Sequence, residues 1–83
     1  MLVTLYTLPN CPQCTATKLY LDKYGITHST VDLSNDAEAS AYINSLGYKQ
    51  APVVVAGEAH WSGFRPDKLF SLSRLLAHET VNA

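Results

Sequence analysis

Two cysteines, Cys11 and Cys14, lie between a strand pattern and a helical pattern near the start of the chain. Residues 2–7 alternate β-branched, aromatic and aliphatic side chains before a proline and an asparagine, which predicts a short buried strand that ends in a turn. Residues 12–24 show apolar side chains at helical spacing, and Gly25 is typical of a helix end. The apolar residues of this predicted helix are Ala16, Leu19, Tyr20 and Tyr24.

The middle of the chain repeats the alternation of strand and helix. Residues 27–32 predict a second strand, and Ser34-Asn35-Asp36 offers capping oxygens to a helix that Gly47 ends. The valines from Val53 onward and residues 59–61 predict two antiparallel strands. Gly57-Glu58, between them, is typical of a two-residue hairpin turn.

A last helix is predicted from Pro66-Asp67, where proline suits the first helical position and the acid suits the first turn. Its apolar residues are Leu69, Leu72 and Leu76, and the tail after Ala77 is expected to fray. The order is therefore β-α-β-α-β-β-α, a four-stranded mixed sheet flanked by three helices. This is the connectivity of an α/β thioredoxin-like fold.

The composition fits one folded domain over residues 1–83. Hydrophobic residues make up 47% and charged residues 16%, far from the composition of disordered chains. Six basic and seven acidic residues are scattered along the chain, so we expect no nucleic-acid partner. The start of the chain has no signal-peptide pattern and no apolar run reaches the length of a membrane span, which predicts a cytoplasmic protein with no membrane partner.

The position of the two cysteines favours thiol–disulfide chemistry. At the start of a helix, free backbone N–H groups and the helix dipole favour a thiolate, so Cys11 is the expected nucleophile. Cys14, one turn further along, is the expected resolving thiol that releases a mixed disulfide. Pro12 stiffens the loop between them, and uncharged Gln13 leaves the dipole as the main local field.

Other interpretations of the cysteine pair remain open. A structural disulfide would close too small a loop to stabilise the fold strongly, and two buried inert cysteines are less favoured than a metal site. A zinc site needs four ligands, whereas His28, His60 and His78 are widely separated and lack the usual paired spacing. We therefore expect no bound metal or cofactor, only a redox-active Cys11–Cys14 disulfide.

Three motifs in order resemble the NrdH-redoxins, and the resemblance covers essentially the whole chain. They are Cys11-Pro12-Gln13-Cys14, Gln50-Ala51-Pro52-Val53 and Trp61-Ser62-Gly63-Phe64-Arg65-Pro66-Asp67. The resemblance implies a monomeric protein disulfide oxidoreductase that is reduced by thioredoxin reductase, and therefore uses NADPH indirectly. It also implies that the chain donates electrons to the large subunit of class Ib ribonucleotide reductase.

The resemblance further implies that the Ala51–Pro52 bond is cis and lies beside the dithiol, where the backbone of Ala51 can pair with an extended partner segment. The residues alone favour a simpler role for Pro52, as the first residue of an edge strand. Trp61 and Phe64 are either partner contacts or ordinary core aromatics. Arg65 is either a partner contact or part of the electrostatics of the helix start.

A glutathione-dependent glutaredoxin is the alternative within redox chemistry, and a cysteine-based metal or iron–sulfur module is the alternative outside it. Leu8 stands near the dithiol where a lysine could hold a carboxylate, and Gln13 replaces the aromatic residue of a glutaredoxin C-P-Y-C motif. These departures predict weak glutathione binding, although Lys49 and Arg65 could still contact an anion.

Overall fold

The computed structural model describes residues 2–82, with the side chains of residues 2–77. The predicted order of strands and helices is confirmed, with one additional short 3-10 turn, η1, before the second helix. The elements are β1 (Val3–Thr7), α1 (Pro12–Lys23), β2 (Ser29–Asp32), η1 (Leu33–Asn35), α2 (Ala37–Ser45), β3 (Val53–Ala56), β4 (Ala59–Ser62) and α3 (Pro66–Asn82).

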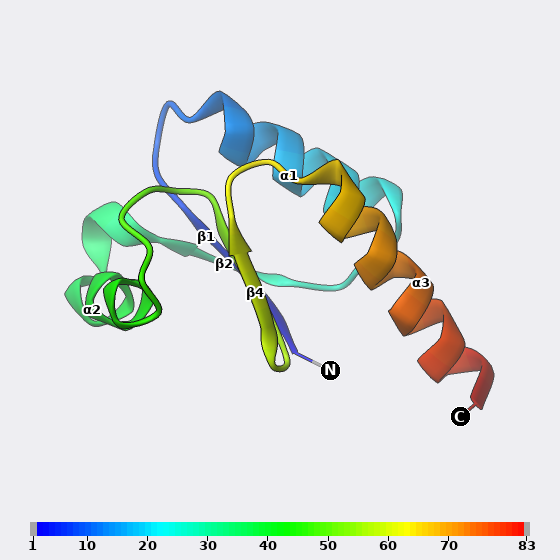
Figure 1. The fold of residues 1–83 in the computed structure, drawn as a ribbon. Coiled ribbons are helices and arrows are strands. Elements are labelled where there is room, and N and C mark those ends of the chain that lie inside the picture. The colour runs from blue at the N-terminus through cyan, green and yellow to red at the C-terminus, as the bar shows by residue number, and fades with distance from the viewer. Residues whose placement is uncertain (1, 83) are drawn as a thin grey trace.

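The four strands form one mixed sheet in the order β2-β1-β3-β4 (Figure 1). Strand β1 pairs with β2 in parallel and with β3 antiparallel, and β3 pairs antiparallel with β4. The β3–β4 turn at Gly57-Glu58 is confirmed, with Ala56 opposite Ala59. Because β1 and β3 are antiparallel, the end of β1 and the start of β3 meet at one end of the sheet, with Tyr6 opposite Val53.

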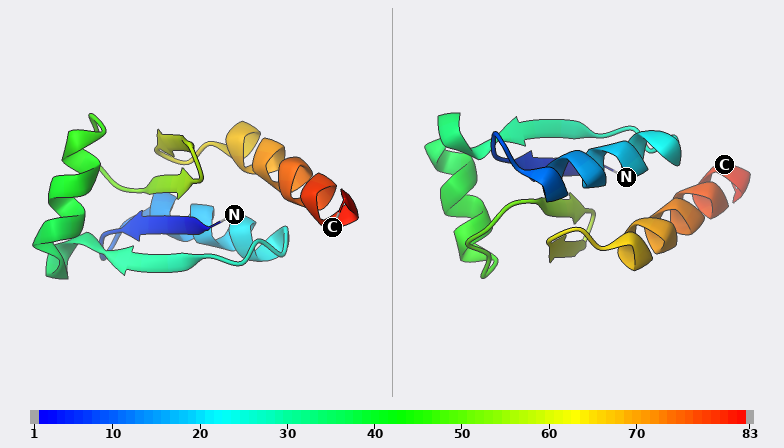
Figure 2. Two further views of the ribbon diagram at one scale, coloured as in Figure 1. Left: turned by 90° about the horizontal axis from the view of Figure 1, so that it is seen from below. Right: turned by 90° about the horizontal axis from the view of Figure 1, so that it is seen from above.

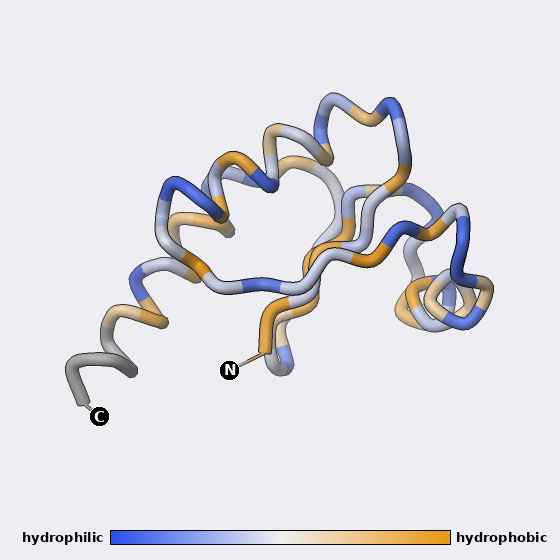
Figure 3. Tube along the Cα trace, turned by 180° about the vertical axis from the view of Figure 1, so that it is seen from behind, coloured by the Kyte–Doolittle hydropathy of each residue, from blue (hydrophilic) through white to orange (hydrophobic). Residues whose placement is uncertain are grey.

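Helices cover both faces of the sheet. Helices α1 and α3 lie on one face and α2 lies on the other, crossing the strand direction (Figures 1 and 2). The hydrophobic residues gather along the strands at the centre, while the helices alternate hydrophobic and hydrophilic residues (Figure 3). On the face of α1 and α3 the sheet contributes most of the main core, namely Val3, Leu5, Val54, Ala56 and Trp61.

The buried face of α1 differs from the predicted one. The predicted stripe included Leu19, which is 63% exposed, whereas Leu21 is fully buried. The residues that α1 buries are Cys14, Thr17 and Leu21, and Tyr20 and Tyr24 pack at the edge of the core. The prediction was wrong because the buried positions, at spacings of three and four residues, include the polar Thr17, so a search for a wholly apolar stripe chose a neighbouring face and left out Leu21. The hydroxyl of Thr17 donates a 2.8 Å hydrogen bond to the carbonyl oxygen of Gln13, so it can be buried without an unpaired polar group.

Two helix ends also refine the prediction. The cap of α2 is Asp36, whose carboxylate accepts a 2.9 Å hydrogen bond from the backbone N–H of Ala39. Helix α3 begins at Pro66 as expected but continues to Asn82, beyond the expected fraying at Ala77. In the part of the chain that the structure describes, no helix is both long and apolar enough to cross a membrane.

Candidate active site

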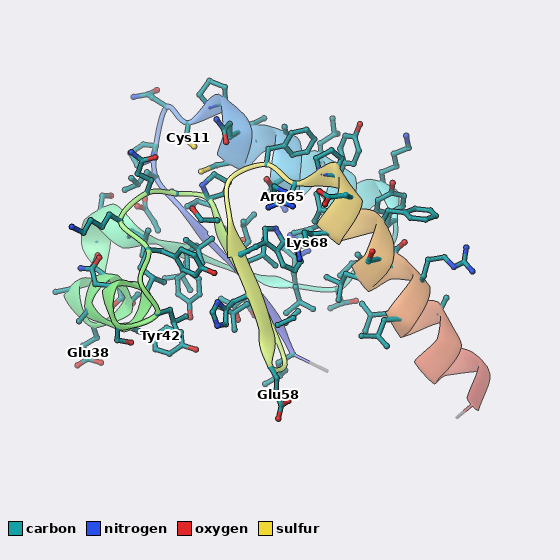
Figure 4. The ribbon with its side chains drawn as sticks, viewed as in Figure 1. Cys11, Glu38, Tyr42, Glu58, Arg65 and Lys68 are labelled. Atoms are coloured by element: carbon teal, nitrogen blue, oxygen red, sulfur yellow. The ribbon has the colours of Figure 1, made fainter. Side chains whose placement is uncertain are left out.

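The loop between β1 and α1 brings Cys11 to the start of the helix. Asn10 has a positive φ of 57°, a conformation that asparagine tolerates better than most residues, and it turns the chain toward the helix. Cys11 is extended and is the N-cap of α1, and Pro12 is the first helical residue. Figure 4 shows Cys11 at this end of α1. The strand-turn-helix arrangement predicted around the cysteine pair is therefore present.

Both cysteines are free thiols, and their surroundings differ. The Sγ atom of Cys11, which is partly exposed, accepts a 3.2 Å hydrogen bond from the backbone N–H of Cys14. This N–H is one of the donors at the helix start that have no partner within the helix. Hydrogen bonds to an ionised acceptor are stronger than those to a neutral one, so the position suits a thiolate at Cys11.

Cys14 is buried directly behind Cys11. Its side chain is 5% exposed, and burial, followed by its hydrogen bond with Cys11, raises the pKa of the Cys14 thiol to about 11. Cys14 is therefore a neutral thiol near neutral pH. The geometry divides the pair into an accessible sulfur and a protonated, shielded sulfur within one helical turn.

The loop that precedes β3 lies at the same end of the sheet as the dithiol. The Ala51–Pro52 peptide bond is cis, as the resemblance implied. Pro52 is buried, and its carbonyl oxygen accepts a 2.8 Å hydrogen bond from the backbone N–H of Gly63. The motif around Pro52 is thus joined to the segment that leads from β4 to α3.

Three consecutive residues of that segment, Ser62-Gly63-Phe64, connect all three motifs. The hydroxyl of Ser62 donates a 3.2 Å hydrogen bond to the carbonyl oxygen of Gln50, and Gly63 donates to Pro52 as described. The backbone N–H of Phe64 donates a 3.1 Å hydrogen bond to Oε1 of Gln13, between the two cysteines. The Gly63–Pro52 bond continues the register of the β3–β4 hairpin, in which Val53 lies opposite Ser62. The contact of Phe64 with Gln13 joins residues 51 positions apart, so no local signal in the sequence pointed to it.

The three predicted partner residues of this region have different surroundings. Trp61 is 6% exposed and belongs to the main core, which favours its role in packing. Phe64 is half-buried, and its ring packs edge-on against Tyr20 with centroids 5.1 Å apart. Arg65 is exposed on the segment leading to α3 (Figure 4), where its guanidinium donates two hydrogen bonds to Asp67, of 3.2 and 3.0 Å.

A surface pocket of about 780 Å³ adjoins the dithiol on the other side. Its lining comes from the β1–α1 loop, one face of α1 and Thr30 of β2, and it includes Leu8, Cys11 and Leu19. The segments around Pro52 and Phe64 do not line this pocket. The dithiol therefore lies between an open pocket beside β2 and the hydrogen-bonded segments beside β3.

Two of the three histidines considered as metal ligands, His28 and His60, have hydrogen-bond partners other than the cysteines. His28 hydrogen-bonds to the carbonyl oxygen of Ile26, and His60 hydrogen-bonds to the hydroxyl of Tyr48. The side chain of His78 lies outside the described residues. Within the described part of the chain, no group of three or more His, Cys, Asp or Glu residues is arranged to hold a metal ion.

Comparison with known proteins supplies independent evidence. The family model for glutaredoxins matches residues 3–61, which include both cysteines and Pro52. The glutaredoxin-like protein NrdH of Escherichia coli K12 is 39% identical over 69 residues, covering 83% of this chain and 85% of that protein. The protein of the same name from Lactococcus lactis subsp. cremoris is 31% identical over 72 residues, covering 87% of this chain and 100% of that protein.

A solved structure of NrdH-redoxin from Escherichia coli, described as having a thioredoxin-like activity profile, has the same fold. It matches with a TM-score of 0.84 at 39% identity, and the match covers 87% of this chain and 95% of that one. The structural likeness therefore covers most of this chain.

Proposed function

Because this chain belongs to the glutaredoxin family, and within it to the NrdH-redoxins, we propose that it reduces protein disulfides through Cys11 and Cys14. Membership makes it an oxidoreductase of that family. The observation that carries the proposal is the pairing of a helix-capping sulfur at Cys11 with a buried, protonated thiol at Cys14.

The proposed reaction has two exchange steps. The thiolate of Cys11 attacks one sulfur of the partner's disulfide, forming a mixed disulfide and releasing the other partner sulfur as a thiolate, which takes up a proton. Cys14 then loses its proton and attacks Cys11, which releases the second partner sulfur and leaves a Cys11–Cys14 disulfide. The second partner sulfur also leaves as a thiolate and takes up a proton. Counted from the fully protonated dithiol, which loses its first proton when Cys11 ionises, the partner gains two electrons and two protons and the dithiol loses them.

We propose that thioredoxin reductase, drawing on NADPH, returns the Cys11–Cys14 disulfide to the dithiol, so that no cofactor is bound by this chain. The proposed electron acceptor is the large subunit of class Ib ribonucleotide reductase. Support comes from the relatives named NrdH and from the thioredoxin-like activity profile ascribed to the solved relative. We place the monomeric protein in the cytoplasm, where thiols are kept reduced.

Features at the start of α3 support weak use of glutathione. A helix N-terminus can bind the carboxylate of a small peptide through its free N–H groups. Here Pro66 has no N–H, and the carboxylate of Asp67 already occupies the first turn. The guanidinium of Arg65 is paired with that same carboxylate. Of the two basic residues that could contact an anion such as glutathione, Lys49 is therefore the one not paired with Asp67.

The decisive experiment measures NADPH consumption with insulin as the disulfide substrate and two alternative electron sources. Turnover with thioredoxin reductase, and little with glutathione plus glutathione reductase, is the expected result. Turnover with glutathione alone would make the protein a glutathione-dependent glutaredoxin. Reduction of a class Ib ribonucleotide reductase by the same coupled system then tests the proposed acceptor.

Cysteine variants provide the controls. Cys11→Ser is expected to abolish turnover, and Cys14→Ser is expected to trap a mixed disulfide with the partner, visible by non-reducing electrophoresis. Persistent activity of Cys11→Ser would overturn the assignment of the nucleophile. Stoichiometric zinc or iron in the purified protein, lost in either variant, would instead support the metal-binding alternative.

A further inference from the structure

The side chain of Gln13 joins the dithiol turn to a segment 51 residues later in the chain. Its Oε1 atom accepts the hydrogen bond from the backbone N–H of Phe64 at 3.1 Å. A backbone N–H can only donate, so the contact defines which end of the Gln13 amide faces Phe64. The carbonyl oxygen of the Gln13 side chain therefore serves as a hydrogen-bond acceptor inside the protein.

The segment that Gln13 holds is the one that also holds Pro52. Gly63, directly before Phe64, donates to the carbonyl oxygen of Pro52 at 2.8 Å and has a positive φ of 86°. A Cβ atom at residue 63 would lie 3.6 Å from Oε1 of Gln13, so the amide packs over this backbone. One side chain between the two cysteines thus connects the start of α1 to the rim formed by Pro52, Gly63 and Phe64.

The ring of Phe64 adds a second contact between the same elements. It packs edge-on against the ring of Tyr20, with an interplanar angle of 78°. Tyr20 lies two turns after Gln13 in α1. The backbone of Phe64 is held by Gln13 and its ring by Tyr20. Two contacts, one to the backbone and one to the ring of Phe64, therefore join the rim to α1.

We propose that Gln13 is a positioning residue. By holding Phe64, it fixes where the rim lies relative to Cys11 and so determines how well a protein disulfide docks. The proposal deepens the proposed function and rests on it, since an extended partner segment is expected to lie along Pro52. Gln13 acts through Phe64 and Gly63. The chemistry of the sulfur atoms does not require it.

Two variants of Gln13 separate the hydrogen bond from the shape of the side chain. Gln13→Met has similar length and no charge but no oxygen, so it cannot accept from Phe64. Gln13→Glu keeps an oxygen at the end of the side chain and can accept the same bond, but it adds a negative charge two residues from Cys11. This variant is therefore judged by KM for insulin and by exchange of the Phe64 N–H, and its rate with Ellman's reagent is not used. We expect the Met variant to raise KM for insulin roughly three- to tenfold, the effect of one lost hydrogen bond, with kcat much less affected. The Glu variant should recover most of this loss.

The insulin assay uses dithiothreitol as the electron source, so it works even if thioredoxin reductase is not the natural reductant. The rate with a small disulfide, Ellman's reagent, is measured in a single turnover on reduced protein freed of dithiothreitol, because dithiothreitol reduces this reagent directly. It reports thiol reactivity without docking, and we expect it to change much less than KM for insulin in the Met variant. Equal losses with both disulfides, or an unchanged KM in the Met variant, would overturn the proposal. Failure of the proposed function would appear instead in the wild-type protein, as no turnover with thioredoxin reductase.

Amide hydrogen exchange gives a readout that does not depend on activity. The N–H of Phe64 is expected to exchange faster in Gln13→Met than in the wild type, and at a near-wild-type rate in Gln13→Glu. Circular dichroism and urea unfolding confirm that each variant is folded before the comparison. An exchange rate that does not differ between the Met variant and the wild type would show that the amide contact does not hold the rim, and would also overturn the proposal.

Discussion

The backbone N–H of Cys14 donates a 3.2 Å hydrogen bond to the Sγ atom of Cys11, while the Cys14 side chain itself is buried. One helical turn thus presents one sulfur at the surface and shields the other. The two thiols should therefore differ in how readily reagents reach them, and burial also raises the pKa of the Cys14 thiol.

Iodoacetamide at neutral pH is expected to modify Cys11 and to spare Cys14 in the reduced protein. Alkylation requires the thiolate, and the pKa of Cys14, raised to about 11, keeps that residue protonated. Mass spectrometry with fragmentation of the labelled peptide measures the two extents of reaction. Labelling of Cys14 should increase as the pH approaches about 11. Equal labelling of both residues at neutral pH would contradict the assigned roles.

The stability of the reduced protein should fall as the pH rises from about 9 to about 11. The pKa of Cys14 is raised above its ordinary value of 9.0, so the folded protein keeps this proton where the unfolded chain has released it. Below that range both states are protonated, and the contribution is fully present. Urea unfolding over a pH series measures the effect, and subtracting the Cys14→Ser series removes the contributions of tyrosines and lysines. A flat difference would contradict the prediction.

Two leucines of α1 test which face of this helix is buried. Leu21→Ala is expected to lower the free energy of unfolding by about 2–5 kcal/mol, because Leu21 is fully buried in the core. Leu19→Ala, a matched control that is 63% exposed, should change it by less than about 0.5 kcal/mol. Chemical denaturation of both variants decides the matter. A larger cost at Leu19 would restore the stripe predicted from apolar residues.

The Arg65–Asp67 pair should be visible in the titration of its carboxyl group. The hydrogen bonds from Arg65 lower the pKa of Asp67, so Arg65→Gln is expected to raise that pKa toward its ordinary value. A lowered pKa means that any stabilisation is present at neutral pH and is lost as the pH falls through the folded-state value. NMR titration of the Asp67 carboxyl measures the shift. An identical titration in both proteins would show that the pair does not form in solution.

The features that the sequence predicted correctly depend on neighbouring residues. Cys11 caps α1, Pro66 begins α3 and Gly57-Glu58 turns the hairpin, each at its expected place. Capping and turn formation involve groups within a few residues of one another, so the signal is contained in short stretches of sequence. The cis bond before Pro52 was expected from the family resemblance, because the residues alone favoured a simpler role.

The sequence by itself determined the order of strands and helices and the position of the cysteine pair at a helix start, because periodicity, caps and turns are local. Only the tertiary structure decided that Thr17 faces inward, that Trp61 is buried and that Gln13 holds Phe64. It also decided that burial raises the pKa of Cys14. These properties depend on which distant segments pack around a residue. Short stretches of sequence do not show which segments the fold brings together.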